Sequence, residues 1–169
     1  VLSKFDGQLI GSYAFLWGQK QERTPTWFGM LTEAGEETEA IDAMHYIWTS
    51  SWPENRTPRV DSILLDGKSY KESVVLETGK IYDAAFEVFD HEGDPLTFRW
   101  EVKPESESRK SGGDREAPLP NLEGLLSDSE SATTRITAPA PGKYRLFAYA
   151  YDGQGHTAHS NIPFLVVEK

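Results

Sequence analysis

The chain has 169 residues and a formal net charge of −10, with 17 Lys and Arg against 27 Asp and Glu. Nucleic acids are bound chiefly by clusters of Lys and Arg that neutralise phosphates, so this balance argues against a nucleic-acid partner. The chain contains no cysteine, which excludes a disulfide framework and a thiolate zinc site. Its hydrophobic content of 38% suffices for a packed core, and no apolar run approaches the ~20 residues that span a bilayer.

The first informative stretch is an apolar run from Tyr13 to Trp17, which is bounded by glycines and followed by polar residues. It is long enough for a strand buried on both faces and too short for a helix. We therefore predict a strand over residues 9–17, preceded by the end of a helix at residues 1–5. The polar loop after such a strand is where α/β barrels carry their functional residues.

A helical pattern follows this loop. Negative charge is favoured at a helix N-terminus, and three acidic residues occur here: Glu36, Glu37 and Glu39. Apolar residues spaced by three and four then follow at Ile41, Met44, Ile47 and Trp48. The pattern predicts an amphipathic helix of about fifteen residues.

Residues 9–52 resemble the last strand, rim loop and helix of the TIM barrel of glycoside hydrolase family 2. The resemblance rests on GSYAFLWGQKQERTPTWFGM at residues 11–30 and GEETEAIDAMHYIWT at residues 35–49. A complete barrel has eight strand–helix units. The resemblance therefore implies that residues 1–52 are the C-terminal α/β fragment of an incomplete barrel, in a bacterial protein that is periplasmic or extracellular.

The resemblance implies a sugar-binding role for Trp17. In that family an aromatic residue at the end of the last strand stacks on the sugar, where a rigid indole supplies contact area at little entropic cost. The alternative is that Trp17 only caps the barrel core. Lys20, Glu22 and Arg23 are candidates for contacts with substrate hydroxyls, and the alternative for these three residues is a solvated, mutually paired loop.

Glycoside cleavage needs two carboxylates that flank the scissile bond. The resemblance places both on barrel strands that this chain lacks, and Glu22 does not match either position. We therefore expect no catalytic residue in this chain, which should be non-catalytic by itself.

Beyond a linker at residues 53–59, which contains two prolines, the apolar period changes to two. This period is typical of strands with one buried face, and about seven such strands are separated by turn residues. The sequence thus predicts a mainly β protein whose residues 60–169 form an Ig-like β-sandwich. The alternating positions are Ile63, Leu65, Val74, Leu76, Tyr82, Ala84, Phe86, Val88, Phe98, Trp100, Val102, Tyr144, Leu146, Ala148 and Ala150.

Two residues suit an Ig-like module in particular. Trp100 lies where such sandwiches place their core tryptophan, and Tyr144 suits a corner tyrosine whose hydroxyl bonds back to the chain. The runs FEVFDHEGDPLTFRW at residues 86–100 and AYDGQG at residues 150–155 resemble repeats of the polycystic-kidney-disease (PKD) and cadherin-like types. Residues 103–121 form a longer loop than a sandwich normally has, and we expect it to be mobile.

Acidic side chains occupy two turns that are expected at one end of the sandwich: Asp90, Glu92, Asp94 and Asp152. Such oxygen ligands suit Ca²⁺. Aspartates in turns also bond their own backbone, and the neighbouring glycines are turn formers. We favour turn chemistry over a calcium site and expect no cofactor.

Phe147, Tyr149 and Tyr151 alternate with the core positions of their strand, so they place three aromatic rings on the outer face of a sheet. This face is a candidate contact surface. It can bind carbohydrate, dock on the barrel, or be covered by the first fifty or so residues. We favour docking, because a short linker holds the module at a high effective concentration beside its partner.

The leading hypothesis is the C-terminal, non-catalytic part of a secreted glycoside hydrolase with an accessory Ig-like domain. Its partners are carbohydrate, through the parent enzyme, and the missing part of the barrel. Unpaired groups of the strand at residues 9–17 also predict that this strand packs on the sandwich or pairs with a second copy of the chain, which would give a homodimer. The rivals are a carbohydrate-binding or adhesion module that uses the outer aromatic face, and a structural spacer.

Overall fold

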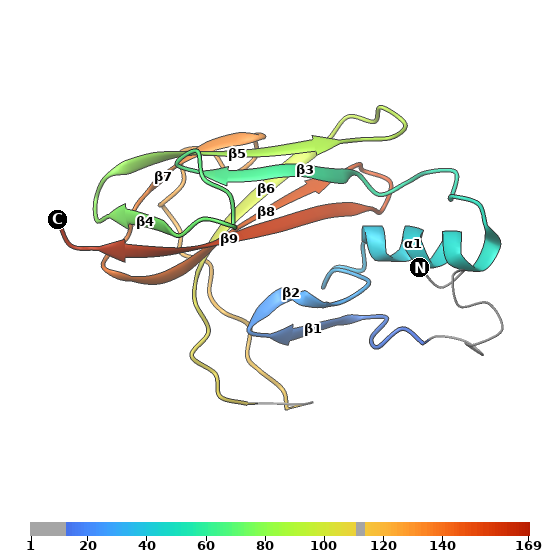
Figure 1. Cartoon of the computed structure of the whole chain (residues 1–169), viewed down its shortest axis with the longest axis horizontal. Helices are drawn as coiled ribbons and strands as arrows, with labels where there is room; N and C mark the ends of the chain where they lie inside the picture. Colours follow the sequence, from blue (N-terminus) through green and yellow to red (C-terminus); the bar gives the residue numbers. More distant parts are fainter. Residues whose placement is uncertain (1–12, 111–113) are drawn as a thin grey trace.

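A computed structural model describes residues 13–110 and 114–169, and it confirms the mainly β sandwich (Figure 1). A two-stranded hairpin and one helix precede seven sandwich strands. The elements in chain order are β1 (Gln19–Glu22), β2 (Thr24–Gly29), α1 (Glu39–Thr49), β3 (Arg59–Leu65), β4 (Val74–Glu77), β5 (Ile81–Phe89), β6 (Thr97–Pro104), β7 (Thr133–Thr137), β8 (Gly142–Tyr151) and β9 (Thr157–Val167).

The sandwich consists of a three-stranded sheet, β3-β5-β7, and a four-stranded sheet, β4-β9-β8-β6. Neighbouring strands are antiparallel except for β4, which runs parallel to β9. Alternate apolar side chains of both sheets point inward and form one core, as the period of two predicts. The largest fully buried side chains include Trp100, Phe86, Leu65, Leu76, Ile136, Leu146 and Ile162.

Both predicted Ig-type features are confirmed. The Trp100 side chain is 2% exposed, and its indole N–H donates to the carbonyl of Ser131 at 2.8 Å. The Tyr144 hydroxyl donates to the carbonyl of Ala140 at 2.9 Å. A tryptophan in the core and a tyrosine corner therefore hold this sandwich together as they do in Ig-like domains.

The chain between β6 and β7 returns to the outer edge of β6. The backbone N–H of Trp100 donates to the carbonyl of Ser129 at 3.0 Å, and the backbone N–H of Leu122 donates to the carbonyl of Val102 at 2.7 Å. These bonds use backbone groups on the side of β6 that faces away from β8. The mobility of residues 103–121 stays a prediction.

The strand predicted over residues 9–17 is wrong for residues 13–17, and residues 1–5 and 9–12 lie outside the described part of the chain. Tyr13 is 100% and Phe15 82% exposed. A strand needs a neighbour for its backbone N–H and C=O groups. The polar stretch that was expected to be a loop forms strands instead, because β1 has β2 as its neighbour. The two strands pair antiparallel and turn at Arg23, whose φ is 60°.

The predicted helix exists but is shorter, since α1 begins at Glu39 and has 11 residues. Glu37 remains extended because its backbone is bonded elsewhere. Its N–H donates to the carbonyl of Gly155 and its carbonyl accepts from the Thr157 N–H, both at 2.8 Å. The residues before α1 therefore attach to the turn between β8 and β9.

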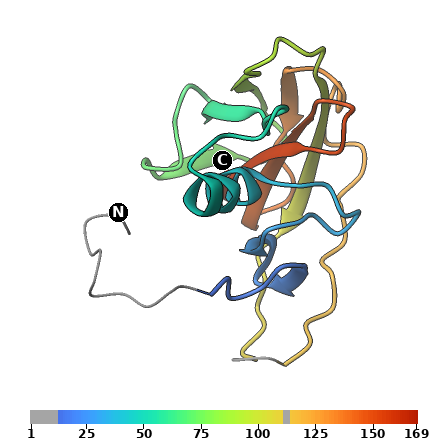
Figure 2. The same ribbon diagram turned by 90° about the vertical axis from the view of Figure 1, so that its right-hand side faces the viewer.

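The hairpin lies next to the outer face of the four-stranded sheet, and α1 lies near the end of the sandwich where β3 begins (Figures 1 and 2). Residues 50–58 join α1 to β3, and Thr57 among them is 1% exposed. The separate folding of residues 60–169 remains a prediction.

We predict that Tyr144→Phe lowers the free energy of unfolding by about 0.5–1.5 kcal/mol, because it removes one hydrogen bond and keeps the ring. The ring stacks on Phe164 at 5.6 Å between centroids, and this contact survives the substitution. Urea denaturation measures the change. Tyr70→Phe is the matched control, since Tyr70 is 61% exposed, and an equal loss in both variants would contradict the corner bond.

Candidate functional site

Large aromatic side chains are concentrated on the surface of the first part of the chain. We call the seven that are at least 44% exposed the aromatic surface: Tyr13, Phe15, Trp17, Trp27, Tyr46, Trp48 and Trp52. Ring contacts connect several of them. The Trp17 and Trp48 centroids lie 6.0 Å apart, and Tyr46 stacks on Trp52 at 4.5 Å. Exposed apolar surface of this kind marks a site of interaction.

The structure places the predicted sugar-binding residues on the hairpin or just before it. Trp17 is 50% exposed, which leaves half of its side chain available for contact. Lys20 and Glu22 form an ion pair with each other, which agrees with the alternative of a mutually paired loop. A role for Trp17, Lys20 and Glu22 in binding sugar stays a prediction.

Arg23 contacts the long loop between β6 and β7. Its N–H donates to the Glu116 carboxylate and its guanidinium to the carbonyl of Ser106, both at 2.9 Å. Glu116 is 6% exposed, and the backbone hydrogen bond from Arg23 holds the pKa of that carboxyl below its ordinary value. Glu116 was not singled out from the sequence, because one glutamate in an irregular polar loop has no periodic signal.

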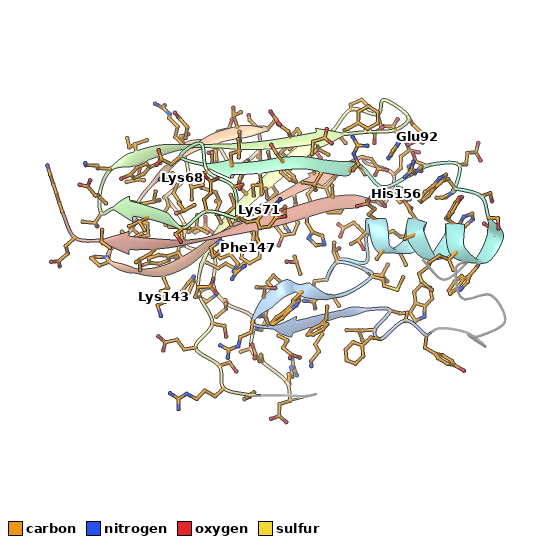
Figure 3. All side chains as sticks on the ribbon, viewed as in Figure 1. Lys68, Lys71, Glu92, Lys143, Phe147 and His156 are labelled. Carbon is orange, nitrogen blue, oxygen red and sulfur yellow. The ribbon has the colours of Figure 1, made fainter. Side chains whose placement is uncertain are left out.

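The prediction that Phe147, Tyr149 and Tyr151 form an exposed face is wrong for this chain. Phe147 is 1% and Tyr149 4% exposed, and only Tyr151 remains half-buried. Figure 3 shows Phe147 on the side of the sheet that faces the hairpin. Of the three alternatives, the structure shows that the first part of the chain covers this face, because the large apolar rings are removed from water there.

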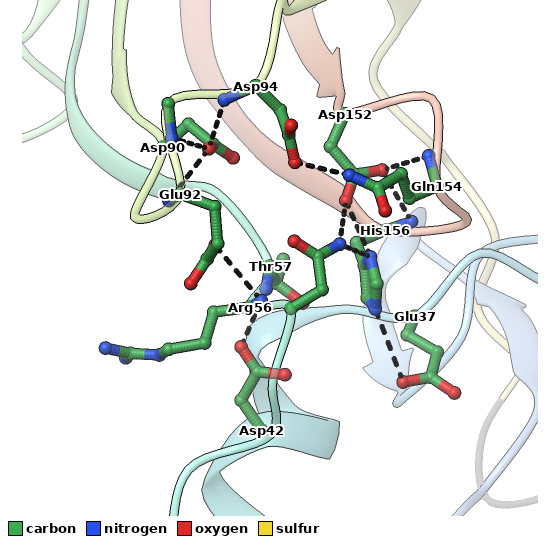
Figure 4. Close-up of polar contacts among 12 residues, drawn as sticks. Glu37, Asp42, Arg56, Thr57, Asp90, Glu92, Asp94, Asp152, Gln154 and His156 are labelled. Carbon is green, nitrogen blue, oxygen red and sulfur yellow. Dashed lines mark hydrogen bonds and ion pairs between the residues drawn. The ribbon is translucent and has the colours of Figure 1, made fainter.

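The two acidic turns meet at one end of the sandwich, as predicted (Figure 4). Asp90 Oδ1 accepts the N–H groups of Glu92, Gly93 and Asp94 at 3.1, 2.7 and 2.7 Å. The side-chain amide of Gln154 then donates to Asp94 Oδ2 and links the two turns. These contacts follow the turn chemistry of aspartate.

Asp152 is the centre of the second turn, and its side chain is buried. Asp152 Oδ1 accepts the backbone N–H of Gln154 at 2.7 Å. Its Oδ2 accepts from Asn55 Nδ2 at 2.8 Å and contacts His156 Nδ1 at 2.6 Å. Burial pushes the pKa of Asp152 upward, but the hydrogen bonds from Gln154, His156 and Asn55 outweigh it and hold the pKa below its ordinary value.

A second carboxylate, Asp42 of α1, attaches the helix to the start of β3. It is 1% exposed, and its Oδ2 accepts the Thr57 N–H at 2.8 Å. The helix pattern concealed this role, because Asp42 resembles one more acidic residue in a first helical turn. Asp42 and Asp152 together fasten α1 and the following residues to the end of the sandwich.

Asp90 and Asp152 thus accept N–H groups of their own turns, Asp94 accepts from Gln154, and Glu92 accepts the backbone N–H of Arg56 at 3.2 Å. Within residues 13–110 and 114–169 no group of three or more His, Asp or Glu side chains is arranged to hold a metal ion. The same part of the chain has no helix that is long and apolar enough to cross a membrane. Binding of calcium is open to direct measurement.

Comparisons with known proteins found likeness among solved structures. No protein-family model matches the chain, and no curated protein matches it. Among solved structures, a provisionally assigned alpha-galactosidase from Bacteroides fragilis NCTC 9343 is similar at a TM-score of 0.38 and 10% sequence identity. The match covers 66% of this chain and 18% of that protein. A likeness at this level carries no conclusion about activity.

We predict that the bonded Asp152 carboxylate stabilises the fold above its unfolded pKa, near 3.8. Because the folded pKa is lower, this contribution is lost as the pH falls through the folded value. The stability advantage of the wild type over Asp152→Asn should therefore shrink below about pH 4. Thermal melts from pH 7 to 2 measure it, with Asp61→Asn, an exposed aspartate, as the control. A constant difference at every pH would contradict the prediction.

We also predict that folding of the acidic turns needs no metal, because the Asp90 and Asp152 carboxylates already accept backbone N–H groups. Melting temperatures with calcium and with chelator should agree within error. A melting temperature that rises steadily with calcium concentration would show binding to the folded state and restore the calcium site.

Proposed function

We propose that this chain is the C-terminal, non-catalytic part of a secreted bacterial glycoside hydrolase. Residues 13–52 belong to the catalytic part of the parent, and the sandwich is an accessory domain that supports them. The support from sequence is the resemblance of residues 9–52 to the end of a family 2 barrel. The structural support is that the hairpin and the residues before α1 contact the sandwich.

The observation that carries the proposal is the aromatic surface. Of the nine aromatic side chains that are at least 44% exposed in the described residues, seven come from residues 13–52, the segment that carries the resemblance, and the other two are Tyr70 and Phe89. Folded monomers seldom leave so many large rings in water. A partner that covers this surface fits the observation, and the remainder of the barrel is the partner that the resemblance implies.

The contacts of this segment with the sandwich support an accessory role. They are polar and come from several places along the chain: Arg23 with Glu116, Asn55 with Asp152, and the backbone of Glu37 with the β8–β9 turn. Such contacts fix orientation as well as proximity. An accessory domain that holds the last loop and helix of a barrel in place would act in this way.

The rival carbohydrate-binding module loses its predicted surface, since Phe147 and Tyr149 are buried. Sugar recognition by the outer sheet face would require the hairpin to move away. The structure therefore favours the accessory role over that rival.

The proposal predicts that the 169-residue chain hydrolyses no glycoside, because one loop cannot place an acid and a nucleophile on opposite sides of a bond. In the full parent enzyme, Trp17→Ala should lower kcat/KM by the equivalent of about 1–3 kcal/mol through lost stacking and positioning. Steady-state kinetics on a panel of aryl glycosides measures this.

Trp27→Ala is the matched control, because Trp27 is also exposed (61%) but stacks on Phe28 in β2. We expect a smaller effect there, and smaller, substrate-dependent effects for Lys20→Ala and Arg23→Ala. Unchanged kinetics for Trp17→Ala on every substrate would limit Trp17 to packing. Turnover by the 169-residue chain alone would contradict the proposal as a whole.

A further inference from the structure

The hairpin has a free edge at β1. Within residues 13–110 and 114–169, β1 has β2 as its one neighbour, and no backbone group of β1 bonds to the backbone of any other segment. Figures 1 and 2 show β1 on the side of the hairpin that faces away from the sandwich. An unpaired edge presents a row of N–H and C=O groups to which another strand can add.

The opposite edge of the hairpin is less open. β2 contains Pro25, which has no N–H to donate. The carbonyl of Pro25 already accepts from the side-chain amide of Gln19 at 3.0 Å, and the Thr26 N–H donates to Thr24 Oγ1 at 3.4 Å. A two-stranded hairpin is marginally stable by itself, so it gains much from a further strand. The place for that strand is beside β1.

Charges of opposite sign alternate along this edge. Lys20 and Glu22 lie two residues apart, so their side chains share one face of the strand. They form an ion pair with each other, and their side chains are 23% and 24% exposed. Gln21 between them is neutral. β1 therefore carries a positive, a neutral and a negative side chain in succession, and the two charges are held in place on one face.

This pattern is complementary to itself when a second copy runs antiparallel. Two copies related by a two-fold axis place one residue opposite its own counterpart. With Gln21 at the axis, Lys20 lies opposite the partner's Glu22, and Glu22 lies opposite the partner's Lys20. Opposite charges directly across two strands stabilise a sheet. An axis at residue 20 or 22 would instead place two lysines or two glutamates opposite each other, so the charges select one register.

Exposed aromatic rings beside β1 add an attraction that has no direction. Phe15 and Trp17 precede the strand and are 82% and 50% exposed. In the same register they lie near the partner's β1–β2 turn, where a second chain removes part of their surface from water. The rings contribute buried area, and the charges fix which residues meet.

We propose that β1 is a self-association edge, to which a second copy of this chain adds its own β1 in antiparallel orientation, with the two Gln21 residues at a two-fold axis. The two hairpins then form one sheet in the order β2-β1-β1-β2. The homodimer expected from residues 9–17 is thereby assigned to a strand that the structure contains. The proposal does not depend on the glycoside hydrolase proposal. In the parent enzyme the rest of the barrel would compete for Phe15 and Trp17, so the test uses the 169-residue chain.

The first measurement is self-association of the whole chain, by sedimentation equilibrium and NMR translational diffusion from about 10 μM to about 1 mM. β1 has only four residues, so we expect a weak dimer with a Kd of about 0.1–1 mM. Amide signals of residues 19–22 should shift with concentration. Added salt should weaken the dimer, because it screens the charges across the axis.

Charge reversal tests the register. Lys20→Glu and Glu22→Lys should each weaken self-association about tenfold or more, because each places like charges opposite one another on both sides of the axis. An equimolar mixture of the two variants should form a heterodimer, since every pair across the axis then joins opposite charges. Mixing cannot restore a variant that fails to fold, so a heterodimer also shows that both variants are folded. The chain that carries both substitutions should self-associate as the wild type does.

Asp61→Lys on β3 is the matched control. Arg59 and Asp61 form the same kind of pair two residues apart on one strand, with 2.8 Å between Arg59 Nη2 and Asp61 Oδ1. Reversing a charge there should leave the Kd of the dimer unchanged, because β3 takes no part in the proposed contact.

Five results would overturn the proposal. The chain could remain monomeric at about 1 mM, neither charge reversal could change the Kd, or the mixture could give no heterodimer. A dimer that survives both reversals and is lost in Trp17→Ala would place the contact on the aromatic surface, and a dimer lost in Asp61→Lys would place it on β3. The glycoside hydrolase proposal would survive all five, because it is tested by turnover in the parent enzyme.

Discussion

The four-stranded sheet has buried aromatic side chains on its outer face as well as a packed inner face, and the rest of the structure depends on this constraint. Its inner face packs against β3, β5 and β7 in the ordinary way, but Phe147 and Tyr149 on its outer face also avoid water. The hairpin covers them. The four-stranded sheet is therefore the middle layer, between the three-stranded sheet and the hairpin, and the first part of the chain completes its burial.

Apolar cover alone would leave the hairpin and α1 free to slide, because the hydrophobic effect has no direction. Polar contacts at the rim supply the direction. Asp152 and Glu116 accept N–H groups from Asn55 and Arg23, which lie 97 and 93 residues away in sequence. Asp42 accepts the backbone N–H of Thr57, 15 residues further along the chain. A carboxylate bonded in this way is costly to detach, since the group left behind loses its partner in a poorly hydrated place.

The sequence revealed most about the parts whose pattern repeats. Strands β3 to β9 alternate between inside and outside, so their number, Trp100 and the Tyr144 corner were predictable. The apolar run at residues 13–17 led to a wrong prediction of a strand, because a local pattern says nothing about whether a neighbouring strand exists. Likewise the role of Glu116 depends on Arg23, 93 residues away in sequence, and such a contact leaves no periodic trace.

The return of the chain to the outer edge of β6 has a consequence for behaviour at high concentration. An uncovered edge strand is a template on which another protein's strand can add, and this is a common start of aggregation. Here the bonds to Ser129 and Leu122 already occupy backbone groups of that edge. A neighbouring molecule therefore meets no free row of N–H and C=O groups along this part of β6 on which it could add a strand.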